Sequence, residues 1–313
     1  MSLETDLLID RRRLKRRLSV WRVVSVVAVV AFIGLALGRF GINFPHRHIA
    51  RLDISGIITD DSALATRVAD LAKDKNVAAL IVAIDSPGGS VAGGEGLHDA
   101  IMAVAARKPV VAVMGGVAAS AGYMIAVPAA RIFAREATLT GSIGVILETG
   151  EVSGLLNKLG VSAEAITSGP LKDQPSFTRP LTPQGRDVLH GLVLDLFDQF
   201  VGMVASGRHM TTDQVRALAD GRAYTGRQAL KLGLVDEIGG EPAAKAWLAS
   251  ARHLSAGLPV EAVAQSGGGN RLFGVSFGGS LGKLLQGAAN TVFSQRLTLD
   301  GAMAVWQPGM TGP

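Results

Sequence analysis

From about residue 49 onward, short apolar runs alternate with segments in which apolar residues recur at helical spacing. Residues 49–58, 77–85 and 110–114 have the apolar, β-branched composition of strands. Residues 61–74 and 93–108, which lie between these runs, have the pattern of amphipathic helices. This repeating order of strand and helix predicts an α/β domain with a mainly parallel sheet.

In the second half of the chain, strand-like runs again alternate with segments of helical spacing, and the predicted helices are longer. We expect a strand, a long helix, a shorter helix, and a helix followed by a brief strand at residues 130–136, 182–208, 211–220 and 225–240. A further apolar run at 161–167 is strand-like. After Leu254 the composition shifts to glycine and serine, which predicts a flexible extension.

The N-terminus carries a different pattern. A basic run, Arg11–Arg17, precedes sixteen residues without a charge, Val23–Gly38. A full membrane span takes about 20 residues. Because this uncharged stretch is shorter, a signal peptide with a weak cleavage site at residues 36–38 remains an alternative interpretation. The long basic region favours an uncleaved anchor, and the positive-inside rule then leaves the N-terminus in the cytoplasm. We therefore divide the chain into a basic cytoplasmic segment, a transmembrane anchor, a linker, an α/β domain and a Gly-rich extension, at residues 1–18, 19–40, 41–49, 50–250 and 251–313.

Charge and composition exclude several classes of function. The formal net charge of +5 lies entirely in residues 1–40, because the remainder carries equal numbers of basic and acidic residues. The folded part therefore has no basic excess for binding nucleic acid. The chain has no cysteine, which excludes a thiol nucleophile, and no HExxH or similar metal-ligand spacing. We expect no metal and no cofactor.

One serine stands out for its surroundings. Ser120 lies among glycines and alanines directly after the predicted strand at 110–114, where small neighbours let a substrate approach closely. A serine nucleophile needs a base to take its proton. None of the six histidines lies in a loop that follows a strand near Ser120. A buried serine bonded to its own helix backbone would show the same pattern, so both interpretations stay open at this point.

Three other segments could supply the rest of a catalytic site. The buried strand at 77–85 leads into a Ser-Pro-Gly-Gly-Ser loop, whose backbone N–H groups suit an oxyanion. Lys172 follows the strand-like run at 161–167, and a lysine in an apolar site has a lowered pKa and can act as a general base. Ser142 lies in a Thr-Gly-Ser-Ile-Gly turn and could hold that amine. Taken singly, the Ser-Pro-Gly-Gly-Ser segment and the segment with Ser142 could each be an ordinary turn, and Lys172 could be an exposed loop lysine.

In this order, the segments SPGGS, AASAGYMIA, TGSIGVI, SGPLKD and GRAYTGRQALKLGLVDEIGG resemble the signal peptide peptidase A family (peptidase family S49). Its members are membrane-bound serine peptidases of the Clp-protease/crotonase-like superfamily. The resemblance runs from about Ile49 to Gly240. It implies the repeated β-β-α superhelix of that superfamily, preceded by one transmembrane helix, and a homo-oligomer of the short, single-domain type.

The resemblance also implies roles for individual residues. Ser120 is expected to be the nucleophile and Lys172 the general base, with Ser142 hydrogen-bonded to the lysine. The backbone N–H groups of Gly89 and Ala121 are expected to form the oxyanion hole. Ala121 stands where the family usually has glycine, which adds a methyl group but keeps the N–H.

These features together predict an endopeptidase in a bacterial cell membrane, with its catalytic domain outside the cytoplasm. The resemblance implies remnant signal peptides and other apolar peptides as substrates, and a dyad that neighbouring subunits could complete together. A catalytically silent membrane scaffold of the same fold is the alternative, and a crotonase-type acyl-thioester enzyme is a more distant one. Neither alternative needs the Ser–Lys pair.

Overall fold

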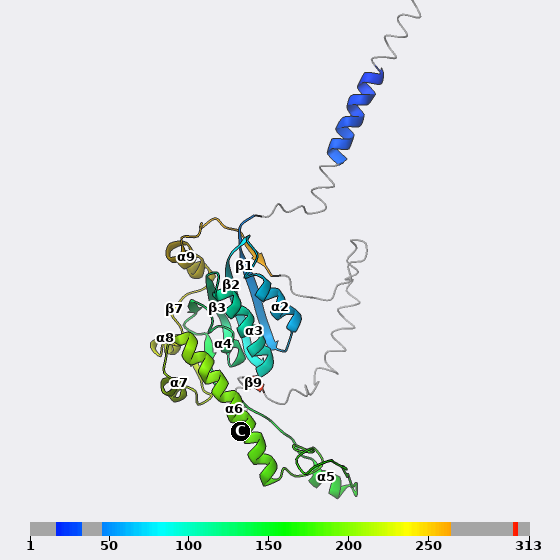
Figure 1. Ribbon diagram of the computed structural model, residues 1–313, viewed down its shortest axis with the longest axis vertical. Helices are drawn as coiled ribbons and strands as arrows, with labels where there is room; N and C mark the ends of the chain where they lie inside the picture. Colours follow the sequence, from blue (N-terminus) through cyan, green and yellow to red (C-terminus); the bar gives the residue numbers. More distant parts are fainter. Residues whose placement is uncertain (1–16, 33–45, 264–302, 306–313) are drawn as a thin grey trace, which may run out of the picture. The chain divides into compact units, whose positions relative to one another are not determined.

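The structure is a computed structural model that describes residues 17–32, 46–263 and 303–305. The chain divides into two units, Met1–His46 and Arg47–Pro313. In the first unit, residues 17–32 form a helix whose side chains are exposed throughout. The remaining residues of the predicted anchor, 33–40, lie outside the described residues. All the strands and every other described helix belong to the second unit (Figure 1).

The described strands form one sheet, in which β6, β5, β3, β2, β1 and β8 are neighbours in that order. Strand β4 branches from β3 and pairs with β7, and β9 pairs with β2. The pairs are parallel except for β5 with β6 and β2 with β9. The strands are β1 (His48–Ile58), β2 (Val77–Ser90), β3 (Val110–Ala119), β4 (Arg131–Ala134), β5 (Leu139–Gly141), β6 (Ala223–Thr225), β7 (Glu237–Ile238), β8 (Val260–Ala262) and β9 (Met303–Val305).

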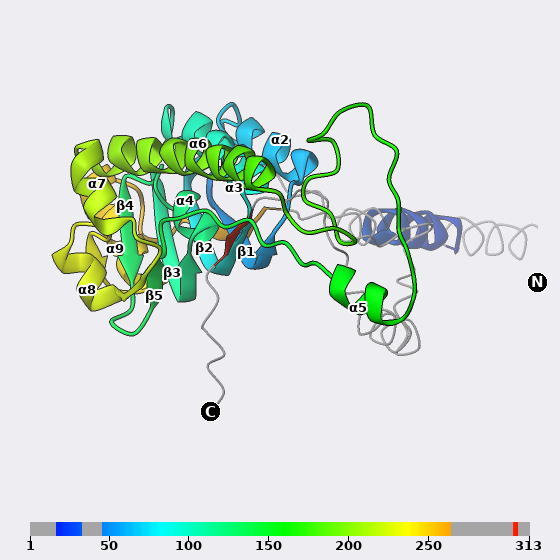
Figure 2. The ribbon, with the colours of Figure 1, turned by 90° about the horizontal axis from the view of Figure 1, so that it is seen from below.

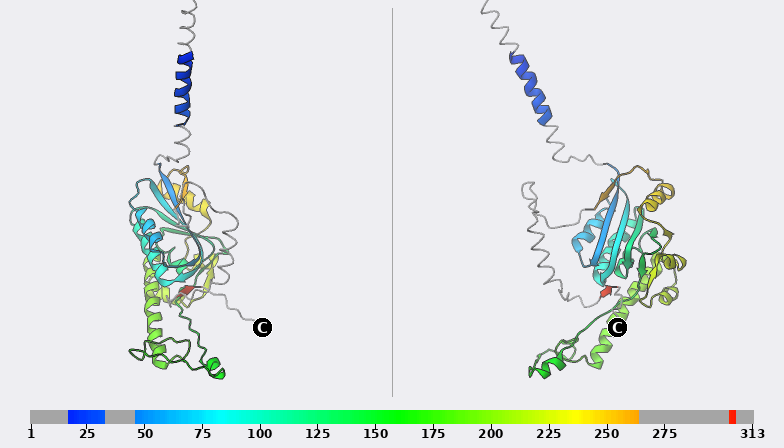
Figure 3. Two further views of the ribbon diagram at one scale, coloured as in Figure 1. Left: turned by 90° about the vertical axis from the view of Figure 1, so that its right-hand side faces the viewer. Right: turned by 180° about the vertical axis from the view of Figure 1, so that it is seen from behind.

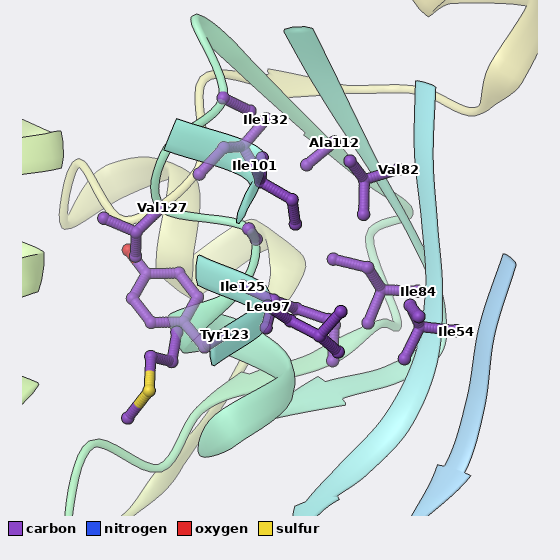
Figure 4. Packing of buried hydrophobic residues seen from close by; sticks show 14 of the residues in the cluster. Ile54, Val82, Ile84, Leu97, Ile101, Ala112, Tyr123, Ile125, Val127 and Ile132 are labelled. Carbon is purple, nitrogen blue, oxygen red and sulfur yellow. The ribbon is translucent and has the colours of Figure 1, made fainter. Parts of the chain in front are cut away.

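Helices cover both faces of this sheet (Figure 2). They are α2 (Ser62–Asp70), α3 (Val91–Ala105), α4 (Ala121–Met124), α5 (Ser153–Lys158), α6 (Pro183–Arg208), α7 (Thr212–Leu218), α8 (Gly226–Lys231) and α9 (Glu241–Arg252). Successive side chains of β2 point to opposite faces of the sheet, as in any β-strand. Leu80, Val82 and Ile84 belong to the larger core with α3 and α4, and Figure 4 shows Val82 and Ile84 in it. Ile81 packs with α9 in the smaller core.

The mixed α/β class predicted from the pattern is confirmed. Two strands are longer than predicted: β3 continues to Ala119, and β2 continues through the Ser-Pro-Gly-Gly-Ser segment to Ser90. This segment pairs with β1, where Ile57 faces Gly88 and Ile58 faces Gly89. It is therefore a paired strand end with a register shift between Ser55 and Ile57, and not a free loop.

The strand predicted at 161–167 is wrong. These residues are irregular and exposed. They lie between α5 and α6, in a segment that projects beyond the sheet (Figures 1 and 3). An apolar run becomes a strand only where a neighbouring strand accepts its hydrogen bonds. We call residues 147–182, which join the sheet to α6 and include α5, the arm.

Among the described residues, one helix of the second unit, α6, is long and apolar enough to cross a membrane. Only 22% of its most apolar stretch is buried. The C-terminal half packs on the sheet through Phe200, Val201 and Val204. Pro183 and the N-cap Thr182, whose side chain accepts from the Gly185 N–H, begin the helix at the arm.

Candidate active site

Ser120 occupies the sharp turn between β3 and α4. Its φ and ψ are 56° and −120°, a region that residues other than glycine rarely adopt, at a cost of about 1–3 kcal/mol. The surrounding backbone holds it there, because the Ser120 N–H donates to the Gly141 carbonyl at 2.8 Å and the Ser120 carbonyl accepts from Tyr123 and Met124. A strained turn from strand to helix is the geometry that presents a nucleophilic serine at the end of a sheet.

The Ser120 hydroxyl is buried and lacks a partner in the described part of the chain. Ser120 is 1% exposed, and its Oγ forms no hydrogen bond with any described residue. Leaving a buried hydroxyl unpaired costs about 1–3 kcal/mol. A serine that only fills the core would bond to the backbone of its own helix. The structure therefore disfavours the core interpretation and leaves the hydroxyl available for a base or a substrate.

The glycine-rich end of β2 packs against this turn. Ser86 of β2 faces Ala118 of β3 across the sheet. A Cβ placed on Gly122 of α4 would lie 2.8 Å from the Ser86 carbonyl oxygen. Close contact at Gly122 brings α4 against the segment that carries Gly89. Gly89 and Ala121, predicted to supply the oxyanion hole, thus lie on elements in direct contact with each other and with Ser120.

Gly89 itself must be glycine for a steric reason. A Cβ at this position would lie 1.8 Å from the Ile58 carbonyl oxygen of β1, and no side chain fits at that distance. The Ser86 hydroxyl shapes the same segment by donating to the Gly56 carbonyl at 2.6 Å and accepting from the Gly88 N–H at 3.1 Å. Backbone positions here are therefore set by the fold rather than by a mobile turn.

Ser142 lies beside Ser120. Ala119 and Gly141 face each other in the β3–β5 pair, so the residues that follow them leave adjacent strands, which lie about 4.8 Å apart. Ser142 also has a positive φ, 48°, and is 5% exposed. Its Oγ donates to the Gly221 carbonyl at 3.1 Å. The hydroxyl therefore keeps its acceptor lone pairs for another donor.

Lys172 does not join this group within one chain. It is exposed on the arm, where its N–H closes a turn onto the Gly169 carbonyl at 3.1 Å. The arm leads away from the sheet (Figure 3). The structure therefore brings Ser120, Ser142, Gly89 and Ala121 together where β2, β3 and β5 end, and it leaves Lys172 away from this group.

Behind the turn lies a buried polar cluster that the sequence pattern did not reveal. Tyr123 is fully buried, and its hydroxyl donates to the Leu234 carbonyl at 2.9 Å. Arg208, at the end of α6, makes a two-pronged ion pair with Asp236 at 2.6 and 3.0 Å and donates to the Gly233 carbonyl. These groups tie α4 and α6 to the segment before β7. No local motif marks them, because the paired residues are far apart in the sequence.

The described residues hold no group of three or more His, Asp or Glu side chains that could bind a metal ion. Buried His98 bonds to the neighbouring Asp99 at 3.0 Å through its Nδ1 atom. Because Ser120 Oγ has no partner among the described residues, no described histidine completes a triad with it.

Several known proteins are similar to this chain. The profile of Peptidase family S49 matches residues 102–255, a range that includes Ser120, Ser142 and Lys172. A Synechocystis protein provisionally named a protease is 41% identical over 205 residues, which are 65% of this chain and 74% of that protein. An Enterococcus faecium protein provisionally named signal peptide peptidase SppA is 36% identical over 62% of this chain and 60% of its own length.

Protease 4 of Salmonella typhi is 38% identical over 56% of this chain, but this match covers only 28% of that protein. Among solved structures, a mutant of ClpP1 from Listeria monocytogenes aligns with a TM-score of 0.40 at 18% identity. The alignment covers 61% of this chain and 91% of that chain.

Proposed function

This chain belongs to peptidase family S49 and is a serine peptidase, and we propose that it cleaves peptides with Ser120 as nucleophile and Lys172 as general base. Membership in this family favours a peptidase over the two alternatives, a catalytically silent scaffold and an acyl-thioester enzyme. The observation that carries the residue assignment is Ser120 itself, with its strained turn and its buried hydroxyl free of any partner among the described residues.

The proposed reaction is acyl transfer. The neutral Lys172 amine takes the Ser120 proton while Oγ attacks the peptide carbonyl carbon, and the carbonyl oxygen becomes an oxyanion. The backbone N–H groups of Gly89 and Ala121 donate to that oxyanion. The tetrahedral intermediate collapses as the amine leaves with a proton from Lys172. Water, activated by the same lysine, then hydrolyses the ester and frees Ser120.

Lys172 reaches Ser120, in this proposal, from a neighbouring copy of the chain. Two observations support this arrangement. Lys172 is exposed on an arm that leads away from the sheet, and the arm carries an unusual number of exposed apolar side chains for an isolated surface. They are Leu155, Leu159, Val161, Ile166 and Phe177, each at least half exposed and Ile166 97% exposed. A second copy that covers these residues would also desolvate the lysine, as a general base requires.

We further propose that residues 19–40 anchor the enzyme in a bacterial cell membrane with the catalytic domain outside the cytoplasm. The basic run before them and the exposed apolar helix at 17–32 support this. Remnant signal peptides and other apolar peptides in or near the membrane are the proposed substrates. In this proposal the domain has the repeated β-β-α superhelix of the Clp-protease/crotonase-like superfamily, and it needs no cofactor.

The first test compares turnover of an apolar fluorogenic peptide by wild type, Ser120→Ala, Lys172→Ala and Lys158→Ala. Lys158 is a matched control, because it is also an exposed lysine of the arm. Loss of a nucleophile or base is expected to lower kcat at least about a thousandfold, or about 4 kcal/mol. Wild-type turnover by Ser120→Ala or Lys172→Ala would overturn the dyad.

A second test asks whether neighbouring copies share the site. Ser120→Ala and Lys172→Ala chains are unfolded, mixed in equal amounts and refolded together. If one copy supplies the serine and the next supplies the lysine around a closed ring, about a quarter of the sites regain both groups. If each chain supplies both groups to its own site, every mixture stays inactive.

A further inference from the structure

The edge of β2 beside Ser120 is already occupied by a strand of the same chain. Strand β9 (Met303–Val305) runs antiparallel to β2, with Met303 facing Ser90, Ala304 facing Gly89 and Val305 facing Gly88. It lies at the end of the sheet to which β1 and β2 run (Figures 1 and 3). A segment from the far C-terminus thus pairs with the residue predicted to donate to the oxyanion.

The register shows which side of β2 this strand takes. A strand has two edges, and at Gly88 and Gly89 one of them is paired with β1. Strand β9 must therefore lie on the other edge, which belongs to β3 as far as the Ser86–Ala118 pair. Strand β3 then turns into Ser120, while β2 continues straight on to Ser90. The edge that β9 occupies is the one that β3 vacates at the nucleophile.

An open strand edge next to a nucleophile recognises a peptide through its backbone. Main-chain hydrogen bonds bind an extended peptide as an added strand with little regard to its sequence. Gly88 and Gly89 leave this edge without side chains, so a second backbone can approach closely. The chemistry of the edge therefore fits any extended peptide, including the chain's own.

We propose that Met303–Val305 is the resting occupant of the substrate edge and competes with incoming peptides from within the same chain. This inference rests on the proposed function, because it takes the edge beside Ser120 to be where substrate binds. A tethered segment has an effective concentration on the order of mM, so even a weak strand holds the edge against dilute peptide. A peptide at high local concentration, as in the plane of a membrane, displaces it.

The test uses the full chain carrying Ser120→Ala, so that binding is measured without turnover. Proline is placed at both Ala304 and Val305, since N–H groups of successive residues in a strand point to opposite sides and one of the two faces β2. The matched control places proline at Thr311 and Gly312, outside β9. Hydrogen exchange of the peptide spanning residues 86–92 and the Kd of a labelled decapeptide of alternating alanine and leucine are measured for each.

The Ala304/Val305 variant is expected to exchange residues 86–92 at least about tenfold faster than the control, since the edge amides lose their cover. Its Kd for the decapeptide is expected to fall at least about threefold, because the competitor is gone. A synthetic peptide of residues 298–309 should restore protection. Unchanged exchange, or faster exchange with an unchanged Kd, would overturn the proposal. Faster exchange of the control chain on dilution would assign the strand to another copy and overturn it as well.

These results are distinguishable from a failure of the proposed function. If Ser120→Ala keeps wild-type turnover, the nucleophile assignment fails, while the exchange and binding data still report on the edge. If Ser120→Ala is inactive and both measurements are unchanged by proline, the peptidase mechanism stands and the resting occupant is refuted.

Discussion

Behind the Ser120 turn, the ion pair between Arg208 and Asp236 is expected to be the interaction whose loss lowers the stability of the fold the most. The Arg208 side chain is 8% exposed and that of Asp236 is 25% exposed. Burial opposes the charge of Arg208, but the hydrogen bonds that its guanidinium donates to Asp236, together with the charge of that carboxylate, hold the arginine pKa above its usual value. Asp236 also accepts from the Ile132 N–H at 2.7 Å. Asp236→Ala therefore leaves both a buried cation and a backbone donor without their main partner.

Breaking one side of a buried ion pair costs about 3–5 kcal/mol. In a domain of this size each kcal/mol lowers Tm by about 2–4 °C, so Asp236→Ala should lower Tm by about 10 °C. The control is Glu136→Ala, because the Arg227–Glu136 pair has a similar distance of 3.1 Å but both side chains are more than 60% exposed. An exposed pair contributes under about 1 kcal/mol.

The assay is thermal unfolding of full-length chains at one protein concentration, followed by circular dichroism. We expect a loss for Asp236→Ala several times that for Glu136→Ala. The double variant Arg208→Met with Asp236→Leu should regain part of the loss, because no unpaired buried charge remains. Equal losses for Asp236→Ala and Glu136→Ala, or no recovery in the double variant, would refute this account of the cluster.

Three further predictions concern the site. Ser120→Gly should raise Tm by about 2–4 °C relative to Ser120→Ala, since glycine relieves the positive φ at Ser120 by about 1 kcal/mol; equal Tm values in a melting comparison would contradict the strain. Gly89→Ala should abolish turnover and destabilise the fold in the same melting assay, because its Cβ would meet the Ile58 carbonyl at 1.8 Å; a folded, active variant would refute the close packing. Burial raises the pKa of Tyr123 above its ordinary value of 10.0, so its contribution is intact below pH 10 and stability falls as pH rises further. Tyr123→Phe should flatten that alkaline loss in urea unfolding at several pH values, and an unchanged slope would count against it.

Much of the fold was predictable from local pattern. Apolar periodicity identified the main strands and helices, because the period of a buried face differs between the two kinds of element. Short-range patterns marked Ser120, Ser142 and the Ser-Pro-Gly-Gly-Ser segment only as candidates, because small-residue turns and glycine-rich segments are visible within a few residues. The roles expected of these residues, and of Gly89 in that segment, came from the family resemblance. The same reasoning failed at 161–167. These residues are apolar enough for a strand, but the described chain offers them no strand to pair with, and they are exposed.

The sequence by itself determined the main strands and helices of the α/β domain, and it showed that small residues surround Ser120 after a strand, because these properties depend on neighbours along the chain. Only the tertiary structure decided that Lys172 stands apart from Ser120 in one chain, that Arg208 meets Asp236, and that Met303–Val305 pairs beside Gly89. Each of these outcomes depends on contacts between distant segments. The free energy of such contacts comes from burial and pairing in three dimensions, which no local spacing encodes.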